Sequence, residues 1–146
     1  MRGRRQGSPF RKILVGFDGS AQAEKAAATA FSLAQVMDAR VILLAVARPA
    51  EPATSVELSA MLDDAREHYE QDFIKLRAKA QQREVELETE IVVGHPAEQI
   101  IRRAEADHID LILLGHRGMS RFEKWILGSI SERVLRYAHC PVMVVR

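Results

Sequence analysis

The stretch LLGHRGMSRFEKWILGSISERVL, residues 113–135, passes from an apolar strand through a glycine-containing loop into an amphipathic helix. Two residues separate Gly115 from Gly118, and nine separate Gly118 from Gly128. Gly128 directly precedes Ser129, where the sequence of the last helix begins. The stretch therefore predicts a strand, a loop and a helix in succession, which is part of the repeating unit of a parallel α/β sheet.

The same alternation of strands and helices runs through the whole chain. Apolar runs as continuous as residues 40–47 are typical of strands that helices cover on both faces. The Ala-rich segment from Ser20 to about Met37 is typical of a helix, with Ser20 placed to cap it. The order predicts an α/β fold, a three-layer α/β/α sandwich around a five-stranded parallel sheet. Strands are expected at residues 12–17, 40–47, 85–93, 109–115 and 140–145, and further helices at 56–83, from 96 onward and from 129 onward.

Apolar residues recur at intervals of three and four through the predicted helix 56–83. This spacing indicates an amphipathic helix with one buried face. The apolar positions are Leu58, Met61, Leu62, Ala65, Tyr69, Phe73, Leu76 and Ala80.

Composition and charge fit one folded domain. The chain has 146 residues, of which 47% are hydrophobic and 28% charged, enough to bury a substantial core. We assign residues 11–146 to this domain and residues 1–10 to a basic tail that is expected to be disordered. The alternative is that the tail contacts nucleic acid or an acidic surface. The overall charge of +1 gives no sign of a polyanionic partner, so we do not expect nucleic acid binding.

Targeting signals and membrane spans are not evident. No apolar run approaches the ~18 residues that a membrane span needs, and the N-terminal segment lacks the apolar stretch of a secretory signal. Cys140 is the single cysteine, so no internal disulfide can form, which fits a reducing compartment. We therefore expect a cytoplasmic protein without membrane contact.

Several familiar catalytic and nucleotide-binding motifs are missing from the sequence. No G-x-x-x-x-G-K-[ST] follows a strand, which excludes the usual P-loop NTPases. No G-x-G-x-x-G follows residues 12–17, so Rossmann-type dinucleotide binding is unsupported. The sequence has no G-x-S-x-G elbow, and its histidines show no metal-ligand spacing.

The glycine-containing stretch is a candidate phosphate site, because ligands of parallel sheets bind beyond the carboxyl ends of the strands. Gly115 and Gly118 lack Cβ atoms, which allows positive φ and close approach of the backbone to a ligand. Ser129 opens a helix whose free N–H groups attract anions, and its hydroxyl can donate to a phosphate oxygen. The alternative is structural: Ser129 to Glu132 reads S-x-x-E, a capping box, and the glycines would be ordinary turn residues.

Asp18, at the end of the first predicted strand, is the second candidate. Its carboxylate could accept hydrogen bonds from ribose hydroxyls or help to hold a divalent cation. It could equally interact with the N-terminus of the first helix. His116 and Arg117 could neutralise phosphate charge, although an exposed turn position is the preferred interpretation of both.

The chain resembles the universal stress protein family. Residues 115–129, GHRGMSRFEKWILGS, fit the family's nucleotide-binding signature G-2x-G-9x-G-[S/T] without a gap. The resemblance covers nearly the whole chain, including ILVGFDGS at 13–20, DLILLG at 110–115 and SISERVLRYAHCPVMVVR at 129–146.

The resemblance implies strand order 3-2-1-4-5, an arrangement like that of the adenine nucleotide alpha hydrolases, with ATP at the strand tips. Asp18 matches the ribose and metal region, and Val46 matches the position whose backbone meets adenine. The phosphates would lie at the glycine positions and the start of the last helix, with Mg²⁺ or Mn²⁺. The implied homodimer pairs Val142–Val145 with the same strand of its partner. The expected ATP-binding residues are Asp18, Val46, Gly115, Arg117, Gly118, Gly128, Ser129, Ile130 and Ser131.

These features lead to a functional hypothesis with two alternatives. We expect an ATP-binding universal stress protein that acts as a nucleotide-dependent stress sensor or regulator, through a regulatory protein partner not yet identified. The first alternative is a slow ATPase or phosphotransferase using the same pocket. Binding is favoured over turnover, because the sequence offers no evident general base and no Walker-type lysine. The second alternative, an interaction module with a vestigial pocket, conflicts with the intact glycine spacing.

Overall fold

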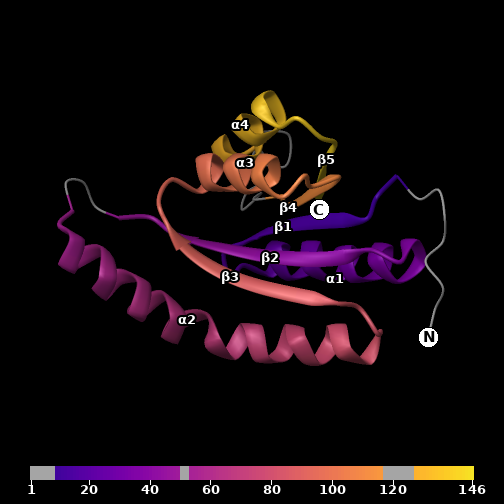
Figure 1. The fold of residues 1–146 in the computed structure, drawn as a ribbon, viewed down its shortest axis with the longest axis horizontal. Helices are drawn as coiled ribbons and strands as arrows, with labels where there is room; N and C mark the ends of the chain where they lie inside the picture. The colour runs from indigo at the N-terminus through magenta and orange to yellow at the C-terminus, as the bar shows by residue number, and fades with distance from the viewer. Residues whose placement is uncertain (1–8, 50–52, 117–126) are drawn as a thin grey trace.

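Five parallel strands form the centre of the protein, in the order β3-β2-β1-β4-β5. The computed structural model describes residues 9–49, 53–116 and 127–146 (Figure 1). The predicted α/β class, parallel sheet and strand order are therefore confirmed. The strands are β1 Lys12–Phe17, β2 Arg40–Ala47, β3 Leu87–Val93, β4 Leu111–Gly115 and β5 Val142–Val145.

Helices cover both faces of the sheet and complete the three layers (Figure 1). One face packs against α1, Ala21–Met37, and α2, Ser55–Gln82, and the other against α3, Pro96–Ala106, and α4, Ser129–Tyr137. None of the helices in the described part of the chain is long and apolar enough to cross a membrane.

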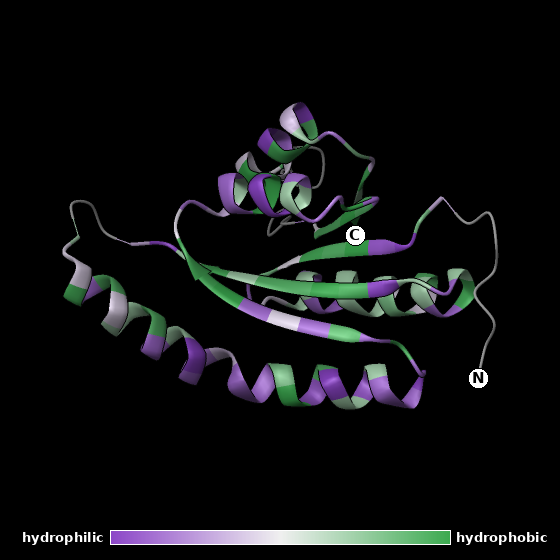
Figure 2. Ribbon diagram, viewed as in Figure 1, coloured by the Kyte–Doolittle hydropathy of each residue, from purple (hydrophilic) through white to green (hydrophobic). Residues whose placement is uncertain are grey.

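The buried residues of β1 show how the sheet divides the core. Ile13, Val15 and Phe17 pack on the side of α1 and α2, whereas Leu14 packs on the side of α3 and α4. Successive strand residues point to opposite faces, so a strand covered on both faces must be apolar at nearly every position. Figure 2 shows this continuous hydrophobicity along the central strands.

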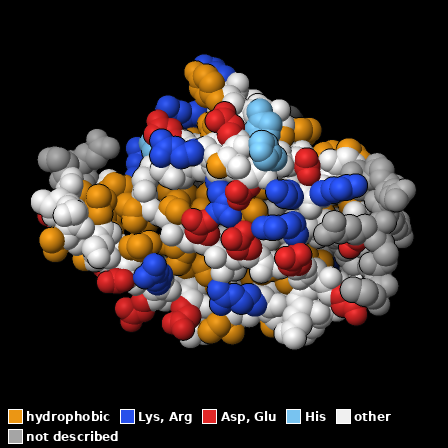
Figure 3. All heavy atoms as spheres, in the orientation of Figure 1, with side chains coloured by type: hydrophobic (Ala, Val, Ile, Leu, Met, Phe, Trp, Pro, Cys, Tyr) orange, Lys and Arg blue, Asp and Glu red, His pale blue; other side chains and the backbone are white. Residues whose placement is uncertain are grey.

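The edge strand β3 has charged side chains at alternate positions, and these pair with basic residues of other elements. Arg103 of α3 pairs with Glu88 at 3.1 Å and also with Glu90 and Asp107. Arg40 pairs with the same Glu88 at 3.2 Å. Charges of both signs are interspersed on this face of the molecule (Figure 3). The alternation of apolar and polar residues in 85–93 thus reflects a strand with one apolar face and one charged face. The charged face links β3 to α3.

Three strands, β3, β4 and β5, begin two residues later than the sequence predicts, and in β3 and β4 the first expected residues instead close the preceding helix. The N–H of Val85 donates to the carbonyl of Ala80 at 2.9 Å, and the N–H of Ile109 donates to Ala104 at 2.9 Å. Glu84 and His108 adopt left-handed conformations with φ of 55° and 52°, as helix C-caps often require. β3 and β4 consequently start at Leu87 and Leu111.

The apolar face of α2 is buried only in its C-terminal part. Burial begins at Ala65 and continues through Tyr69 to Ala80, whereas Leu58 and Met61 are half-buried. The first turns of α2 extend past the sheet (Figure 1), which explains why an apolar pattern there does not produce full burial.

Gly115 is required by the packing of α1 against the end of β4. A Cβ atom at Gly115 would lie 2.5 Å from the carbonyl carbon of Gln22 and 2.7 Å from the nitrogen of Ala23. Gly115 does not use the positive φ that a glycine allows, because the residue pairs with Val145 and remains part of β4. The glycine therefore permits its backbone to lie close to the first turn of α1.

Gly115→Ala should lower the free energy of unfolding by about 1–3 kcal/mol, the usual cost of overpacking a rigid site. Gly128→Ala is the matched control, because among the described residues no atom beyond its chain neighbours lies within 4 Å of a Cβ atom at that position. We expect the control to lose at most about 1 kcal/mol, the effect of alanine at an N-cap. Chemical denaturation of both variants measures the difference, and equal losses would contradict this account of Gly115.

Candidate functional site

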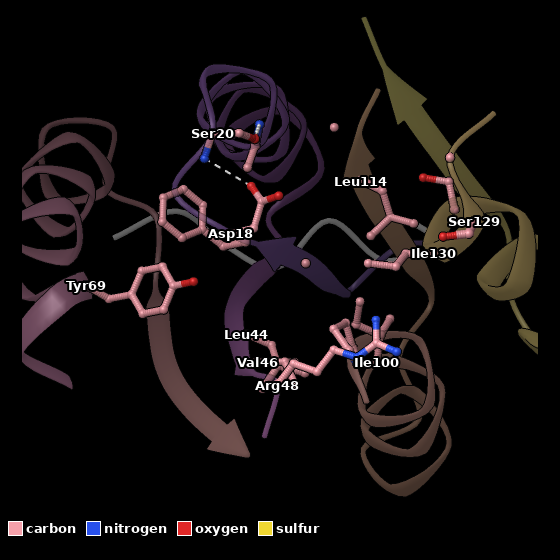
Figure 4. Close-up of a pocket in the computed structure, with 17 residues that line it drawn as sticks. Asp18, Ser20, Leu44, Val46, Arg48, Tyr69, Ile100, Leu114, Ser129 and Ile130 are labelled. Atoms are coloured by element: carbon pink, nitrogen blue, oxygen red, sulfur yellow. Dashed lines mark hydrogen bonds between the residues drawn. The ribbon is translucent and has the colours of Figure 1, made fainter. Parts of the chain in front are cut away.

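A cavity of about 440 Å³ lies at the carboxyl ends of β1, β2 and β4 (Figure 4). Its volume is in the range of ligand-binding pockets. This is the edge at which parallel sheets bind ligands. All of the predicted site residues that the structure describes line this cavity: Asp18, Val46, Gly115, Gly128, Ser129, Ile130 and Ser131. The other two, Arg117 and Gly118, lie outside the described residues.

Asp18 interacts with the start of α1, which is one of the two roles that the sequence left open, and it also lines the cavity. Its Oδ1 accepts a hydrogen bond from the N–H of Ser20 at 3.0 Å, which holds the turn before α1. Ser20 is the N-cap of α1, as predicted, and its hydroxyl accepts from the N–H of Ala23 at 3.1 Å. The carboxylate also lines the cavity, so the turn fixes its position toward a ligand.

The start of α4 differs from the predicted capping box. Gly128 is the N-cap, with φ of −62°, and no side chain caps the helix. Ser129 is the first helical residue, and its side chain is exposed. The structural alternative for Ser129 is therefore wrong, because the S-x-x-E pattern begins one residue inside the helix. The first N–H groups of α4 have no partner within their helix, so this end of the cavity favours an anion.

The floor of the cavity is apolar, and its charges are few. Leu44, Val46 and Ile100 line one part, and Leu114 and Ile130 line another (Figure 4). Among the described lining residues, the charged side chains are Asp18 and Arg48. The floor suits a flat apolar group, and the start of α4 suits a charged one.

Tyr69 and Arg48 are lining residues that the sequence did not identify as part of the site. The intervals in α2 predicted that Tyr69 is buried, but burial does not tell which helical position adjoins the cavity. Arg48 follows β2 directly, one position beyond Ala47, so its place at a strand tip was the signal that could have found it. Burial, followed by the charge of Asp72, raises the pKa of Tyr69.

His116 and Cys140 lie near the sheet edge but do not line the cavity. His116 is buried, so its expected position as an exposed turn residue is wrong. Its N–H donates to the carbonyl of Val145 at 2.7 Å, which shows that the chain has not yet left the sheet there. Burial raises the pKa of the Cys140 thiol, followed by the charge of Asp110, so the thiolate is disfavoured.

A protein-only metal site was not found in the part of the chain that the structure describes, since no group of three or more His, Cys, Asp or Glu side chains could hold an ion there. Asp18 is the one carboxylate among the described lining residues. A divalent cation at this cavity would therefore need ligand oxygens in addition to protein oxygens.

Comparison with known proteins identifies relatives along almost the whole chain. Residues 9–146 match the model of the universal stress protein family. A universal stress protein of Methanocaldococcus jannaschii is 34% identical over 144 residues, which cover 94% of this chain and 82% of the relative. Universal stress protein YxiE of Bacillus subtilis is 33% identical, with 94% of this chain and 99% of the relative covered.

Solved structures of similar fold extend the comparison. Universal stress protein UspA from Lactobacillus plantarum has a TM-score of 0.78 and 29% identity, with 94% of this chain and 98% of that chain covered. More distant structures with the same fold include a universal stress protein in complex with cAMP, at 24% identity and a TM-score of 0.67. Another is a family protein from Arabidopsis thaliana with AMP bound, at 20% identity and a TM-score of 0.64.

Ser129→Ala should leave the free energy of unfolding within about 0.5 kcal/mol of the wild-type value, since the hydroxyl caps no helix. Ser20→Ala should cost about 1 kcal/mol, because its hydroxyl is a cap. Thermal and urea unfolding of the two variants test the assignment. A loss in Ser129→Ala as large as in Ser20→Ala would show that Ser129 caps α4 after all.

Proposed function

The chain belongs to the universal stress protein family, and on that premise we propose that it binds ATP and acts as a nucleotide-dependent stress sensor or regulator. The observation that carries this proposal is the cavity at the strand tips. It combines an apolar floor, the Asp18 carboxylate and the start of α4 without a side-chain cap. The nucleotide complexes of distant members of the same fold support an adenine nucleotide as the ligand.

The proposed arrangement assigns each part of the nucleotide to one part of the cavity. The base lies on the apolar floor at Val46, and the ribose hydroxyls donate to Asp18. The phosphates bind at Gly128 and Ser129, where the first N–H groups of α4 and its dipole favour negative charge. Arg117 and Gly118, outside the described residues, complete the cradle in this proposal.

A divalent cation fits the cavity only together with the nucleotide. Mg²⁺ commonly binds one or two carboxylates and several phosphate oxygens. Asp18 would be the protein ligand to Mg²⁺ or Mn²⁺, and the remaining oxygens would come from the phosphates and water. The cation would offset phosphate charge beside the Asp18 carboxylate.

Turnover is the alternative use of the same cavity, as a slow ATPase or phosphotransferase. Among the described lining residues, Asp18 is the sole carboxylate and no histidine is present. The Asp18 carboxylate already accepts a hydrogen bond from the N–H of Ser20. This arrangement favours binding over general-base catalysis. We further propose that the protein acts in the cytoplasm, where a regulatory protein partner responds to its nucleotide state.

Gly128→Val should reduce ATP affinity by roughly 100-fold or more, because the branched side chain occupies the space that the phosphates need and removes several charge-assisted hydrogen bonds. The fold should survive, since apart from its chain neighbours no atom in the described part of the chain lies within 4 Å of a Cβ atom at this position. Isothermal titration with ATP and Mg²⁺ measures the loss, and Gly118→Val is expected to act in the same way. Retained affinity in Gly128→Val would contradict the proposed cradle.

Two companion measurements separate the functional alternatives. Mass spectrometry of nucleotides released from denatured wild-type protein, together with the titration, tests binding itself. A chain that neither carries nor binds adenine nucleotide would overturn the proposal. Incubation with ATP and Mg²⁺ then tests turnover, and ADP formed by the wild type but not by Gly128→Val would favour the enzymatic alternative.

The open edge of β5 supports the proposed homodimer. The carbonyls of Pro141 and Val145 accept from Ile112 at 3.0 Å and His116 at 2.7 Å. Because alternate residues of a parallel strand bond to the same neighbour, Val142 and Val144 direct their backbone groups away from β4. β5 is the last strand of the sheet, so these groups can pair with the same strand of a second copy.

Val144→Pro should convert the dimer to a monomer, because proline removes an outward N–H donor and leaves the β4 ladder intact. Val144→Ala is the control, since it shortens the side chain but keeps the N–H. Analytical ultracentrifugation across a range of protein concentrations measures the change. A wild-type monomer, or a Val144→Pro dimer as tight as the wild type, would exclude pairing through β5.

A further inference from the structure

Tyr69 presents its phenol hydroxyl to the cavity from α2. The side chain is only 8% exposed and lines the cavity, and Figure 4 shows the hydroxyl directed into it. A tyrosine hydroxyl that faces a cavity is open to a hydrogen bond with a ligand.

Packing explains the ring of Tyr69 but not its hydroxyl. The ring stacks on Phe73 with centroids 5.9 Å apart and meets Phe17 edge-on at 6.1 Å. His68 contacts the same ring at 4.8 Å. A phenylalanine at this position would keep all of these contacts. The hydroxyl therefore points to a ligand rather than to the core.

The hydroxyl is a hydrogen-bond donor at neutral pH. Burial, followed by the negative charge of Asp72, raises the pKa of Tyr69 above its already high ordinary value. The phenol consequently stays protonated when the protein is near neutral pH. Its natural partner is an acceptor, such as a ribose oxygen or a ring nitrogen of a base.

We propose that Tyr69 is a ligand-contacting residue whose hydroxyl donates a hydrogen bond to the nucleoside portion of the bound nucleotide. This inference rests on the proposed nucleotide binding and adds α2 to the elements that recognise the ligand. Tyr69 and Ser129 lie on opposite sides of the cavity, with Asp18 between them (Figure 4). A donor on the side away from α4 meets the sugar or base, while the phosphates lie at the start of α4.

Tyr69→Phe tests the hydroxyl alone. The variant should bind ATP, ADP and AMP each roughly 3- to 10-fold more weakly than the wild type, by the same factor for all three ligands. Ser129→Ala should instead lose more affinity as the number of phosphates rises. Tyr137→Phe, which removes a hydroxyl from a residue 60% exposed and outside the cavity, should bind as the wild type does. Circular dichroism and thermal unfolding should show Tyr69→Phe folded with an unchanged Tm.

Hydrogen–deuterium exchange gives a second readout that uses the wild-type chain. Saturating ATP should slow exchange in α2 around Tyr69 as well as at the start of α4. In Tyr69→Phe saturated with ATP, the protection in α2 should fall while that in α4 remains.

The outcomes distinguish this inference from the proposed function. A wild-type chain that binds no adenine nucleotide overturns both. Nucleotide binding with unchanged affinity in Tyr69→Phe, or without protection of α2 in the wild type, overturns the role of Tyr69 alone. A loss in Tyr69→Phe that grows with the number of phosphates also overturns it, because the hydroxyl would then contact the phosphates.

Discussion

The approach of α1 to the end of β4 is the constraint on which the site depends. Atoms of the Gln22 backbone lie so close to Gly115 that a Cβ atom there would be 2.5 Å from the nearest of them. This approach places the turn at Asp18 beside the exit of β4, although the two are far apart in sequence. Without it, the carboxylate and the start of α4 would not line the same cavity. The cavity thus depends on glycine at position 115, because this residue allows α1 to pack closely against β4.

Aromatic residues on the side of the sheet that α1 and α2 cover connect α2 to the same part of the molecule. Phe17, the last residue of β1, meets Tyr69 and Phe73 of α2 at centroid distances of 6.1 and 6.0 Å. Asp18 follows Phe17 directly, so the contact that holds α2 against the sheet also adjoins the turn that holds the carboxylate. Core packing and the lining of the cavity therefore share one short segment, and substitutions at Phe17 would disturb both.

Local patterns predicted the elements of the fold, and long-range packing determined the details of the site. Residues 12–17 and 40–47 have the bounds that their continuous apolar runs indicated. The place of Asp18 and Gly128 at one cavity also followed from the rule that strand ends meet at one edge. The cause of the glycine at 115 could not be predicted, because the backbone that it accommodates belongs to α1. His116 was misplaced for a similar reason, since its pairing partner is Val145. The place of Tyr69 at the cavity could not be predicted, because the sequence does not show which turn of the 28-residue helix α2 reaches the strand tips.

The helix starts around the cavity explain the direction in which a nucleotide would lie. At α1, backbone N–H groups at the positive end of the helix already have acceptors. The Ser20 hydroxyl accepts from the N–H of Ala23, and the Asp18 carboxylate accepts from the N–H of Ser20. At α3 the N-cap His95 gives no side-chain cap either, but the first helical residue is Pro96, which has no N–H to donate. The start of α4 has no side-chain cap and has serine as its first residue. An anion gains most at α4 and is repelled by the carboxylate beside α1. The caps at α1, the proline at α3 and the Asp18 carboxylate are thus consistent with the proposed placement of the phosphates at α4 and of the ribose and base near Asp18 and Tyr69.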